Sequence, residues 1–199
     1  SKIKSTVQNK PEALLSVASG NSPLKIFEEL IRMNLSEEID FSNSNFVSLD
    51  EWIGLGINHS DSCVNVMDHY LFSQINLPTV NICFFDGESN DPMKECHRID
   101  KFIASKGGID FMLIGVGMNG HMGLNEPGVD PELYSHVIRI DEITKKVAQE
   151  KYFEQPVDLE KGITLGIRHI MESREITVII NGKHKAEICR KILQGEISN

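Results

Sequence analysis

Five short apolar runs are spread along this chain, and amphipathic segments separate them. The runs are rich in β-branched and aromatic residues and fall at 13–18, 45–49, 80–85, 111–116 and 176–180. Most are apolar at consecutive positions rather than at alternate ones, so we expect strands that are buried on both faces. Such strands occur in parallel sheets with helices on both sides.

The segments between the runs carry the apolar spacing and end signals of helices. Ser22-Pro23 and Asp91-Pro92 both have the form of a helix start, and Gly107-Gly108 is typical of a helix end. The other predicted helices span residues 63–75, 143–153, 164–171 and 183–193. Alternating strands and helices predict an α/β fold, a three-layer α/β/α sandwich around a mostly parallel, Rossmann-like sheet, in a single domain over residues 1–199.

Charge and composition exclude several classes of partner. The 199 residues carry 20 Lys and Arg against 29 Asp and Glu, a net charge of −9, so we expect no nucleic-acid and no membrane partner. No run is long enough to span a membrane, and the N-terminus lacks the apolar core of a signal peptide, which favours the cytoplasm. The histidines show no metal-binding spacing, so no metal site is expected. The four scattered cysteines are expected to be reduced core residues: Cys63, Cys83, Cys96 and Cys189.

Polar residues follow three of the runs, at the strand ends where ligands of such sheets bind. The first run leads into Ser19-Gly20-Asn21-Ser22 before a helix start. This loop indicates either a phosphate site, built on free backbone N–H groups and the helix dipole, or a plain helix cap. The second run leads into Asp50-Glu51, whose carboxylates suit either proton transfer or a cap.

The fourth run leads into a glycine-rich loop, Gly115-Val-Gly-Met-Asn-Gly-His-Met-Gly-Leu-Asn-Glu-Pro-Gly128. Its G-x-G-x-x-G pattern does not fit a dinucleotide site, because a loop follows instead of a helix and no acidic ribose contact lies at the usual distance. The loop instead presents His121, which can move a proton near neutral pH, and Glu126, which can orient the imidazole.

This loop closely resembles the signature of the glucosamine-6-phosphate isomerase/deaminase family. Four other segments resemble family motifs in the same order, over roughly residues 12–197: Ser19–Pro23, Leu49–Leu55, Thr164–Ser173 and Gly182–Ala186. The related 6-phosphogluconolactonases share the fold and the G-x-G-x-x-G-H pattern but usually continue into Thr-Ala-Ser-Leu-Phe-Pro. The run Asn125-Glu126-Pro127 therefore points to the isomerase branch.

The resemblance implies a substrate, a reaction and a role for each site residue. The substrate is glucosamine-6-phosphate or galactosamine-6-phosphate, the products are a ketohexose 6-phosphate and ammonia, and no cofactor is implied. Asp50 is implied to be the base that takes the C2 proton and returns it to C1. His121, with Glu126 as its partner, is implied to open the sugar ring. The phosphate is expected on Ser19, Gly20, Asn21, Ser22, Lys151 and Lys185.

Four residues depart from the family pattern. Asn119 stands where many members have Asp, and an amide cannot stabilise an imidazolium by charge, so more of that role falls on Glu126. Lys151 replaces an Arg and so exchanges a bidentate fork for a point charge. Asn21 replaces a Gly in the phosphate loop, and Trp52 replaces a Tyr beside the base. These departures, with the Gly-His-Met-Gly-Leu-Asn-Glu-Pro run, slightly favour a galactosamine branch.

Two other functions stay open from the sequence. One is a 6-phosphogluconolactonase. The other is a non-catalytic phosphosugar-sensing domain, which would keep the phosphate loop without needing Asp50, His121 and Glu126 together. A homo-oligomer is also left open. Compared with the family pattern, the chain looks trimmed at both ends: members usually carry an extra N-terminal helix, and a further strand and helix after the segment that matches residues 194–196.

Overall fold

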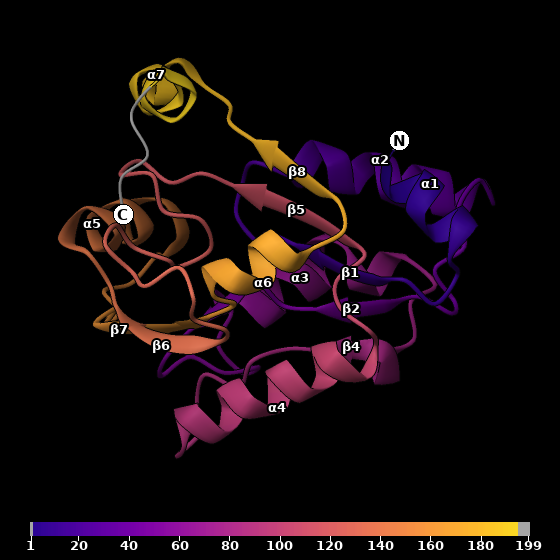
Figure 1. Ribbon diagram of the computed structural model, residues 1–199, viewed down its shortest axis with the longest axis horizontal. Helices are drawn as coiled ribbons and strands as arrows, with labels where there is room; N and C mark the ends of the chain where they lie inside the picture. The colour runs from indigo at the N-terminus through magenta and orange to yellow at the C-terminus, as the bar shows by residue number, and fades with distance from the viewer. Residues whose placement is uncertain (1, 195–199) are drawn as a thin grey trace.

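A computed structural model describes residues 2–194. At its centre lies a parallel five-stranded sheet with the strand order β4-β2-β1-β5-β8 (Figure 1). Each strand falls within one of the predicted apolar runs: β1 (Leu14–Val17), β2 (Asn45–Val47), β4 (Ile82–Cys83), β5 (Phe111–Gly115) and β8 (Ile176–Ile179). The predicted α/β class and the mostly parallel sheet are confirmed.

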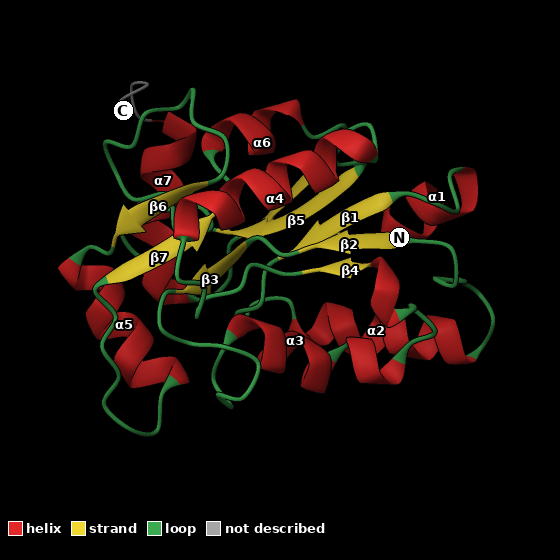
Figure 2. Ribbon diagram, turned by 90° about the horizontal axis from the view of Figure 1, so that it is seen from below, coloured by secondary structure: helices red, strands yellow, loops and turns green. Residues whose placement is uncertain are grey.

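Helices cover both faces of this sheet (Figure 2). One face carries α1 (Lys2–Asn9), α2 (Leu24–Leu35) and α3 (Cys63–Tyr70), and the other carries α4 (Pro92–Ser105) and α6 (Ile167–Glu172). Alternate strand residues serve the two faces, as the pleat of a strand requires. In β5, Phe111 packs toward α2 and Met112 packs toward α4, and both are buried.

A second, antiparallel sheet stands beside the first and was not predicted. Its strand order is β3-β7-β6, with β3 (Asp50–Trp52), β7 (Lys161–Thr164) and β6 (His136–Arg139). Helix α5 (Glu142–Tyr152) packs on this sheet, and Ala148 lies in a cluster with Trp52 and Ile140. Asp50 therefore begins a short strand of its own instead of simply following the second strand of the main sheet.

The prediction of a helix from residue 164 is wrong at its start. Thr164 ends β7, and α6 begins only at Ile167. The Thr164 hydroxyl donates to the Leu49 carbonyl at 3.3 Å, and the Leu165 N–H donates to the same carbonyl at 2.8 Å. These bonds keep residues 164–165 extended beside β3.

Two other predicted helices differ in detail. Residues 63–75 form α3 and then a 3-10 helix over Phe72–Gln74, and residues 183–193 form a 3-10 helix over Lys183–Lys185 and then α7 (Ala186–Gln194). A further 3-10 turn covers Thr79–Asn81. Helix α1 was not predicted, because it buries only Ile3 and Val7. Of the segment at 194–196, Gly195 and Glu196 lie outside the described residues.

Three of the four cysteines are buried in the core, and one is only partly buried. Cys63, Cys83 and Cys96 are buried, which confirms the expected core position. The expectation is wrong for Cys189, which is only partly buried because α7 buries none of its residues and lies apart from the sheet in Figure 1.

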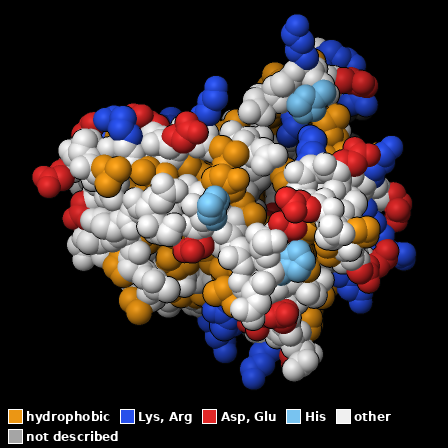
Figure 3. Space-filling model, turned by 180° about the vertical axis from the view of Figure 1, so that it is seen from behind, with side chains coloured by type: hydrophobic (Ala, Val, Ile, Leu, Met, Phe, Trp, Pro, Cys, Tyr) orange, Lys and Arg blue, Asp and Glu red, His pale blue; other side chains and the backbone are white. Residues whose placement is uncertain are grey.

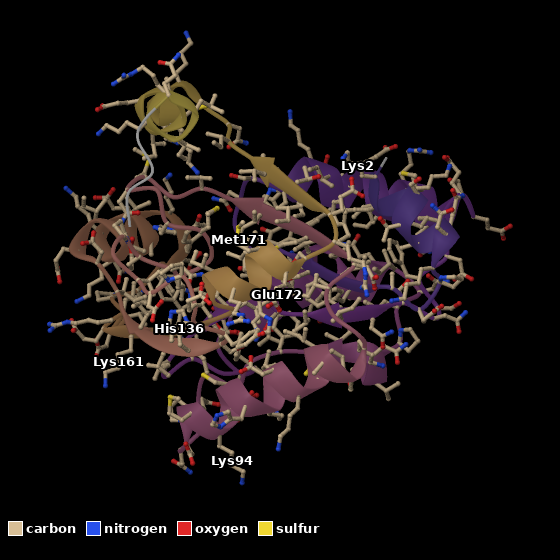
Figure 4. All side chains as sticks on the ribbon, in the orientation of Figure 1. Lys2, Lys94, His136, Lys161, Met171 and Glu172 are labelled. Atoms are coloured by element: carbon tan, nitrogen blue, oxygen red, sulfur yellow. The ribbon has the colours of Figure 1, made fainter. Side chains whose placement is uncertain are left out.

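The surface carries charges of both signs. Figure 3 shows Lys and Arg side chains interspersed with Asp and Glu rather than gathered in one continuous patch on that face. In Figure 4, Lys94 on α4 and Lys161 on β7 point away from the body of the molecule. Among residues 2–194, no helix has the length and apolar character needed to cross a membrane.

Candidate active site

A cavity of about 560 Å³ opens where β1 and β5 end. These neighbouring strands belong to different halves of the sheet, since the chain runs outward from β1 to β4 and then returns to β5. Ligands of open α/β sheets bind at such a reversal of strand order. The cavity is lined by most of the residues predicted from the sequence: Ser19, Gly20, Asn21, Ser22, Asp50, His121, Lys151 and Lys185. Asn119 and Glu126 do not line it.

The glycine loop after β5 holds the His121 ring against its own backbone. A Cβ on Gly117 would lie 2.1 Å from the His121 Cε1 atom, so a side chain at residue 117 would displace the imidazole. Gly120 has a φ of 98°, which favours glycine. Gly117 and Gly120 are therefore needed to place His121.

Asn119 determines which nitrogen of His121 carries the proton. The Asn119 Oδ1 atom accepts the His121 backbone N–H at 3.2 Å and lies 2.7 Å from His121 Nδ1. A backbone N–H can only donate, so the Asn119 atom that faces His121 is the oxygen. Nδ1 must therefore carry the proton, and Nε2 is left with a free lone pair.

Glu126 reaches His121 through Asn119. The Glu126 carboxylate is buried, and its Oε2 atom accepts from Asn119 Nδ2 at 2.7 Å. The same oxygen lies 3.8 Å from His121 Nδ1, which is beyond hydrogen-bond distance. Its Oε1 atom accepts the Asp141 backbone N–H at 3.2 Å. Asn119 therefore lies between His121 and Glu126, which the sequence analysis expected to be direct partners.

The surroundings keep the His121 imidazole neutral. Burial lowers its pKa, the nearby charge of Glu126 raises it, the charge of Lys185 lowers it, and that of Asp141 raises it. The net pKa lies below the usual range, so the neutral ring with a free Nε2 is the form present at pH 7.

The two acidic residues of the Asp50-Glu51 pair have different surroundings. Neighbouring strand residues point to opposite faces. Asp50 lines the cavity, whereas Glu51 is fully buried and accepts the backbone N–H groups of Cys63 at 2.9 Å and Val64 at 3.0 Å at the start of α3. The cap interpretation thus applies to Glu51, whereas the Asp50 side chain faces the cavity.

Burial raises the pKa of both carboxyls. The pKa of Asp50 rises to about 6, although its hydrogen bond with the Cys63 thiol, at 3.6 Å between Sγ and Oδ1, works against the rise. Burial raises the pKa of Glu51 to about 7, against the lowering effect of its backbone N–H bonds. A carboxyl with a pKa near 6 is mostly ionised at pH 7 and can still hold a proton briefly, as a proton-transfer group must.

The loop before α2 forms the other end of the cavity. No side chain caps α2 at Pro23, which argues against the plain-cap reading of residues 19–22. The Ser22 hydroxyl donates to Asn181 Oδ1 at 3.1 Å, which ties the loop to the chain after β8. A Cβ on Gly20 would lie 3.2 Å from the Tyr152 hydroxyl, so α5 lies close over the loop.

Two lysines stand at this end of the cavity. Lys185 is half-buried and donates from Nζ to the Val116 carbonyl. Burial lowers the pKa of Lys185, and the charge of Lys151 lowers it further, so the two cations lie close enough to repel each other. A bound dianion would relieve this repulsion.

Thr144 and Tyr152 were not predicted as site residues. Both belong to α5 and line the cavity, beside the predicted Lys151. Thr144 and Lys151 are seven residues apart, which is two helical turns, so both fall on one face. Once Lys151 was predicted to be a site residue, this spacing could have indicated Thr144 as well.

A family model described as glucosamine-6-phosphate isomerases/6-phosphogluconolactonase matches residues 1–199. The chain belongs to this family. The family resemblance expected from the motifs is thereby confirmed.

Relatives in the glucosamine-6-phosphate isomerase/6-phosphogluconolactonase family match nearly the whole chain. The glucosamine-6-phosphate deaminase of Bacillus pumilus (strain SAFR-032) is 38% identical over 196 residues, which cover 98% of this chain and 81% of that protein. Glucosamine-6-phosphate deaminase 1 of Bacillus subtilis (strain 168) is 36% identical over 194 residues, which cover 97% of this chain and 80% of that protein. The chain thus spans about four-fifths of the length of these relatives.

Solved structures of the family agree with the fold. A monomeric glucosamine-6-phosphate deaminase has a TM-score of 0.94 at 34% identity, covering 99% of this chain and 82% of that one. The 6-phosphogluconolactonase of Thermotoga maritima has a TM-score of 0.74 at 18% identity, and the match covers 98% of this chain and 84% of that one. The lactonase shares the fold, while the deaminase is close in sequence as well.

Proposed function

We propose that this chain is an isomerase that converts a hexosamine 6-phosphate and water to a ketohexose 6-phosphate and ammonia. One observation carries the proposal: Asp50 and His121 line the same cavity as the Ser19–Ser22 loop and two lysines. The close relatives named as glucosamine-6-phosphate deaminases support the reaction type. Their names also support a phosphorylated amino sugar as the substrate.

The anion end of the cavity suits the substrate's phosphate. The loop precedes a helix start, where backbone N–H groups and the helix dipole favour an anion. Lys151 and Lys185 supply two positive charges in a protein of net charge −9. A phosphate held there extends the sugar toward Asp50 and His121.

His121 is the group that opens the sugar ring in this proposal. Its free Nε2 takes the proton from the C1 hydroxyl, and the resulting imidazolium gives a proton to the ring oxygen as the C1–O5 bond breaks. The product is the open-chain aldehyde. Glu126, acting through Asn119, favours the transient imidazolium by its charge.

Asp50 is the group that moves the carbon-bound proton. Its carboxylate takes the proton from C2, the electron pair forms the C1=C2 double bond, and the C1 oxygen takes a proton from the substrate's ammonium group, which gives an enolamine. The same carboxyl returns the proton to C1, which leaves an imine at C2. Water then adds to the imine, and ammonia leaves as the ketone forms. These steps move protons and water only and so call for no redox cofactor.

Ammonia release separates this function from the alternatives. We expect ammonia from glucosamine-6-phosphate, galactosamine-6-phosphate or both, measured by a coupled assay, and none from the unphosphorylated sugars. The slight preference for the galactosamine epimer stays a prediction that the same assay tests. Hydrolysis of 6-phosphogluconolactone without ammonia release from either hexosamine would establish the lactonase instead, and binding without turnover of any of these would establish a sensing domain.

A homo-oligomer and a cytoplasmic location also stay predictions. The related solved deaminase is described as monomeric. Light scattering of this chain, with and without sugar phosphate, measures its own state.

A further inference from the structure

We propose that Thr144 is a positioning residue for His121, which holds the imidazole so that Nε2 stays in the cavity. The inference rests on the proposed function, because it assigns His121 the proton transfer that opens the sugar ring. Thr144 lies in the first turn of α5 and is buried. It belongs to a different element from His121, which stands on the glycine loop.

The Thr144 hydroxyl is a second acceptor for the proton on the imidazole. Its Oγ1 atom lies 3.1 Å from His121 Nδ1 and 3.4 Å from Asn119 Nδ2. Asn119 has already fixed the proton on Nδ1, so the hydroxyl oxygen accepts and the ring donates. The Nδ1–H group therefore points between two oxygens, one at 2.7 Å and one at 3.1 Å.

The Thr144 oxygen is the acceptor that comes from outside the loop. Asn119 is only two residues from His121, and Glu126 follows on the same segment, so both move with the loop. That segment contains glycines at 115, 117, 120 and 123, whose backbones have no Cβ to restrict their conformation. Helix α5, in contrast, is anchored by Ala148 in the cluster around Trp52. A hydrogen-bond acceptor on this helix therefore holds the His121 ring in position relative to the sheet on which α5 packs.

The start of α5 contacts the glycine loop at two points. The Asp141 backbone N–H donates to Glu126 Oε1 at 3.2 Å, and Thr144 contacts His121 one helical turn later. The Asp141 side chain caps the helix by accepting the Ile143 N–H at 2.9 Å. The capped first turn is thus held in the position from which Thr144 reaches the ring.

Burial and three charged groups set the pKa of His121 around this contact. Burial and Lys185 lower it, and Glu126 and Asp141 raise it. An acceptor on Nδ1–H favours the imidazolium more than the neutral ring, because a charged donor makes the stronger hydrogen bond. Removal of the Thr144 hydroxyl should therefore lower the pKa of His121 further.

The test compares Thr144→Val, which keeps the shape and removes the hydroxyl, with Thr144→Ser, which keeps the hydroxyl. Thr6→Val is the matched control, because Thr6 also lies in a helix but on the far α1, where its hydroxyl donates to the Lys2 carbonyl. Two quantities are measured: kcat and KM on a hexosamine 6-phosphate, and the pH titration of the His121 ring in the free protein by ¹H–¹⁵N NMR. The His121 signals are assigned by their loss in His121→Gln.

We expect Thr144→Val to lower kcat about three- to tenfold, as the loss of one hydrogen bond implies, with KM within about twofold. Its His121 titration should move to lower pH. Thr144→Ser should recover most of the rate and titrate like the wild type, and Thr6→Val should change neither quantity. If Thr144→Val does not fold, Thr144→Ala takes its place against the same serine variant.

Two results would overturn the proposal: an unchanged His121 titration in the valine or alanine variant, or an equal loss of kcat in the serine variant. The titration needs no turnover. If the wild type releases no ammonia, the proposed function fails, and the NMR arm still decides whether Thr144 holds the ring.

Discussion

Asn119 Oδ1 lies 2.7 Å from His121 Nδ1, and this contact leaves Nε2 of the imidazole as the free base. The amide of Asn119 also donates to Glu126 at 2.7 Å. An aspartate at residue 119 could make the first contact but not the second, since an ionised carboxylate only accepts. Asn119 therefore supplies the N–H donor that the neighbouring Glu126 carboxylate accepts, which an aspartate could not do.

Asn119→Asp should raise the pKa of His121, because it places a negative charge against Nδ1–H. If the neutral ring is the working form, the acid limb of the kcat profile should move to higher pH. The variant also brings two carboxyls to hydrogen-bond distance, so its thermal stability should fall more at pH 8 than at pH 5. The kcat profile and the melting temperature across pH measure both effects.

The double variant Asn119→Asp with Glu126→Gln is the control, because the new amide at 126 can donate to the new carboxylate at 119. It should regain the stability lost at pH 8 and keep the raised His121 pKa. An unchanged kcat profile in both variants would show that residue 119 does not act on the imidazole.

His121→Gln should lower kcat with the cyclic substrate about a hundredfold or more, in line with the loss of a general acid–base group. Its effect on KM should be small, because proton transfer is an interaction of the transition state. Glu126→Gln should lower kcat less, since Glu126 acts through Asn119. Equal losses of binding and turnover in both variants would assign this loop a structural role.

Lys185→Ala should weaken the affinity for the sugar phosphate about ten- to a hundredfold, the effect of removing one partly buried charge-assisted contact. Lys183→Ala is the matched control, because Lys183 is two residues away, exposed and outside the cavity lining. Inorganic sulfate should compete with the substrate beyond its effect on ionic strength. Normal binding by Lys185→Ala, together with no competition by sulfate, would place the phosphate elsewhere.

Asp50→Asn should stabilise the protein at pH 8 and leave its stability nearly unchanged at pH 4. The folded protein raises the pKa of Asp50 to about 6, so it holds the proton more tightly than the unfolded chain does. Stability therefore falls as pH rises from about 4 to about 6, and the loss persists above that range. For a half-buried carboxyl the loss is about 1–2 kcal/mol. Melting temperatures at the two pH values measure it, and an equal difference at both would contradict a raised pKa.

The strands of the main sheet could be predicted because each lies within a short run rich in apolar and β-branched residues. The second sheet could not, because its strands are short and polar or broken by glycine. Asp50–Trp52 contains two acidic residues, and its partner Lys161–Thr164 contains Gly162. These strands pair across more than a hundred residues, and their pairing depends on tertiary contacts that no local pattern shows.

Most of the predicted residues that line the cavity lie in segments that a motif marks, but the hydrogen bonds around them could not be predicted. The G-x-G-x-x-G-H run pointed to His121, but nothing in the order of residues shows that Asn119 intervenes between His121 and Glu126. From the sequence, the Asp50-Glu51 pair could serve either proton transfer or helix capping. In the structure, the pleat of β3 directs the Asp50 carboxyl into the cavity and the Glu51 carboxyl to the start of α3.

The most direct test of the central claim follows the proton at C2 in D₂O. With wild-type protein and a hexosamine 6-phosphate, ammonia should accumulate, and the ketohexose 6-phosphate should carry deuterium at C1 in the fraction of turnovers in which the proton on Asp50 exchanges with D₂O before it returns. Asp50→Asn should bind the sugar phosphate with a Kd within about threefold of the wild type, and it should show neither C2 exchange nor ammonia release. Exchange and turnover by Asp50→Asn near the wild-type rate would show that Asp50 is not the base.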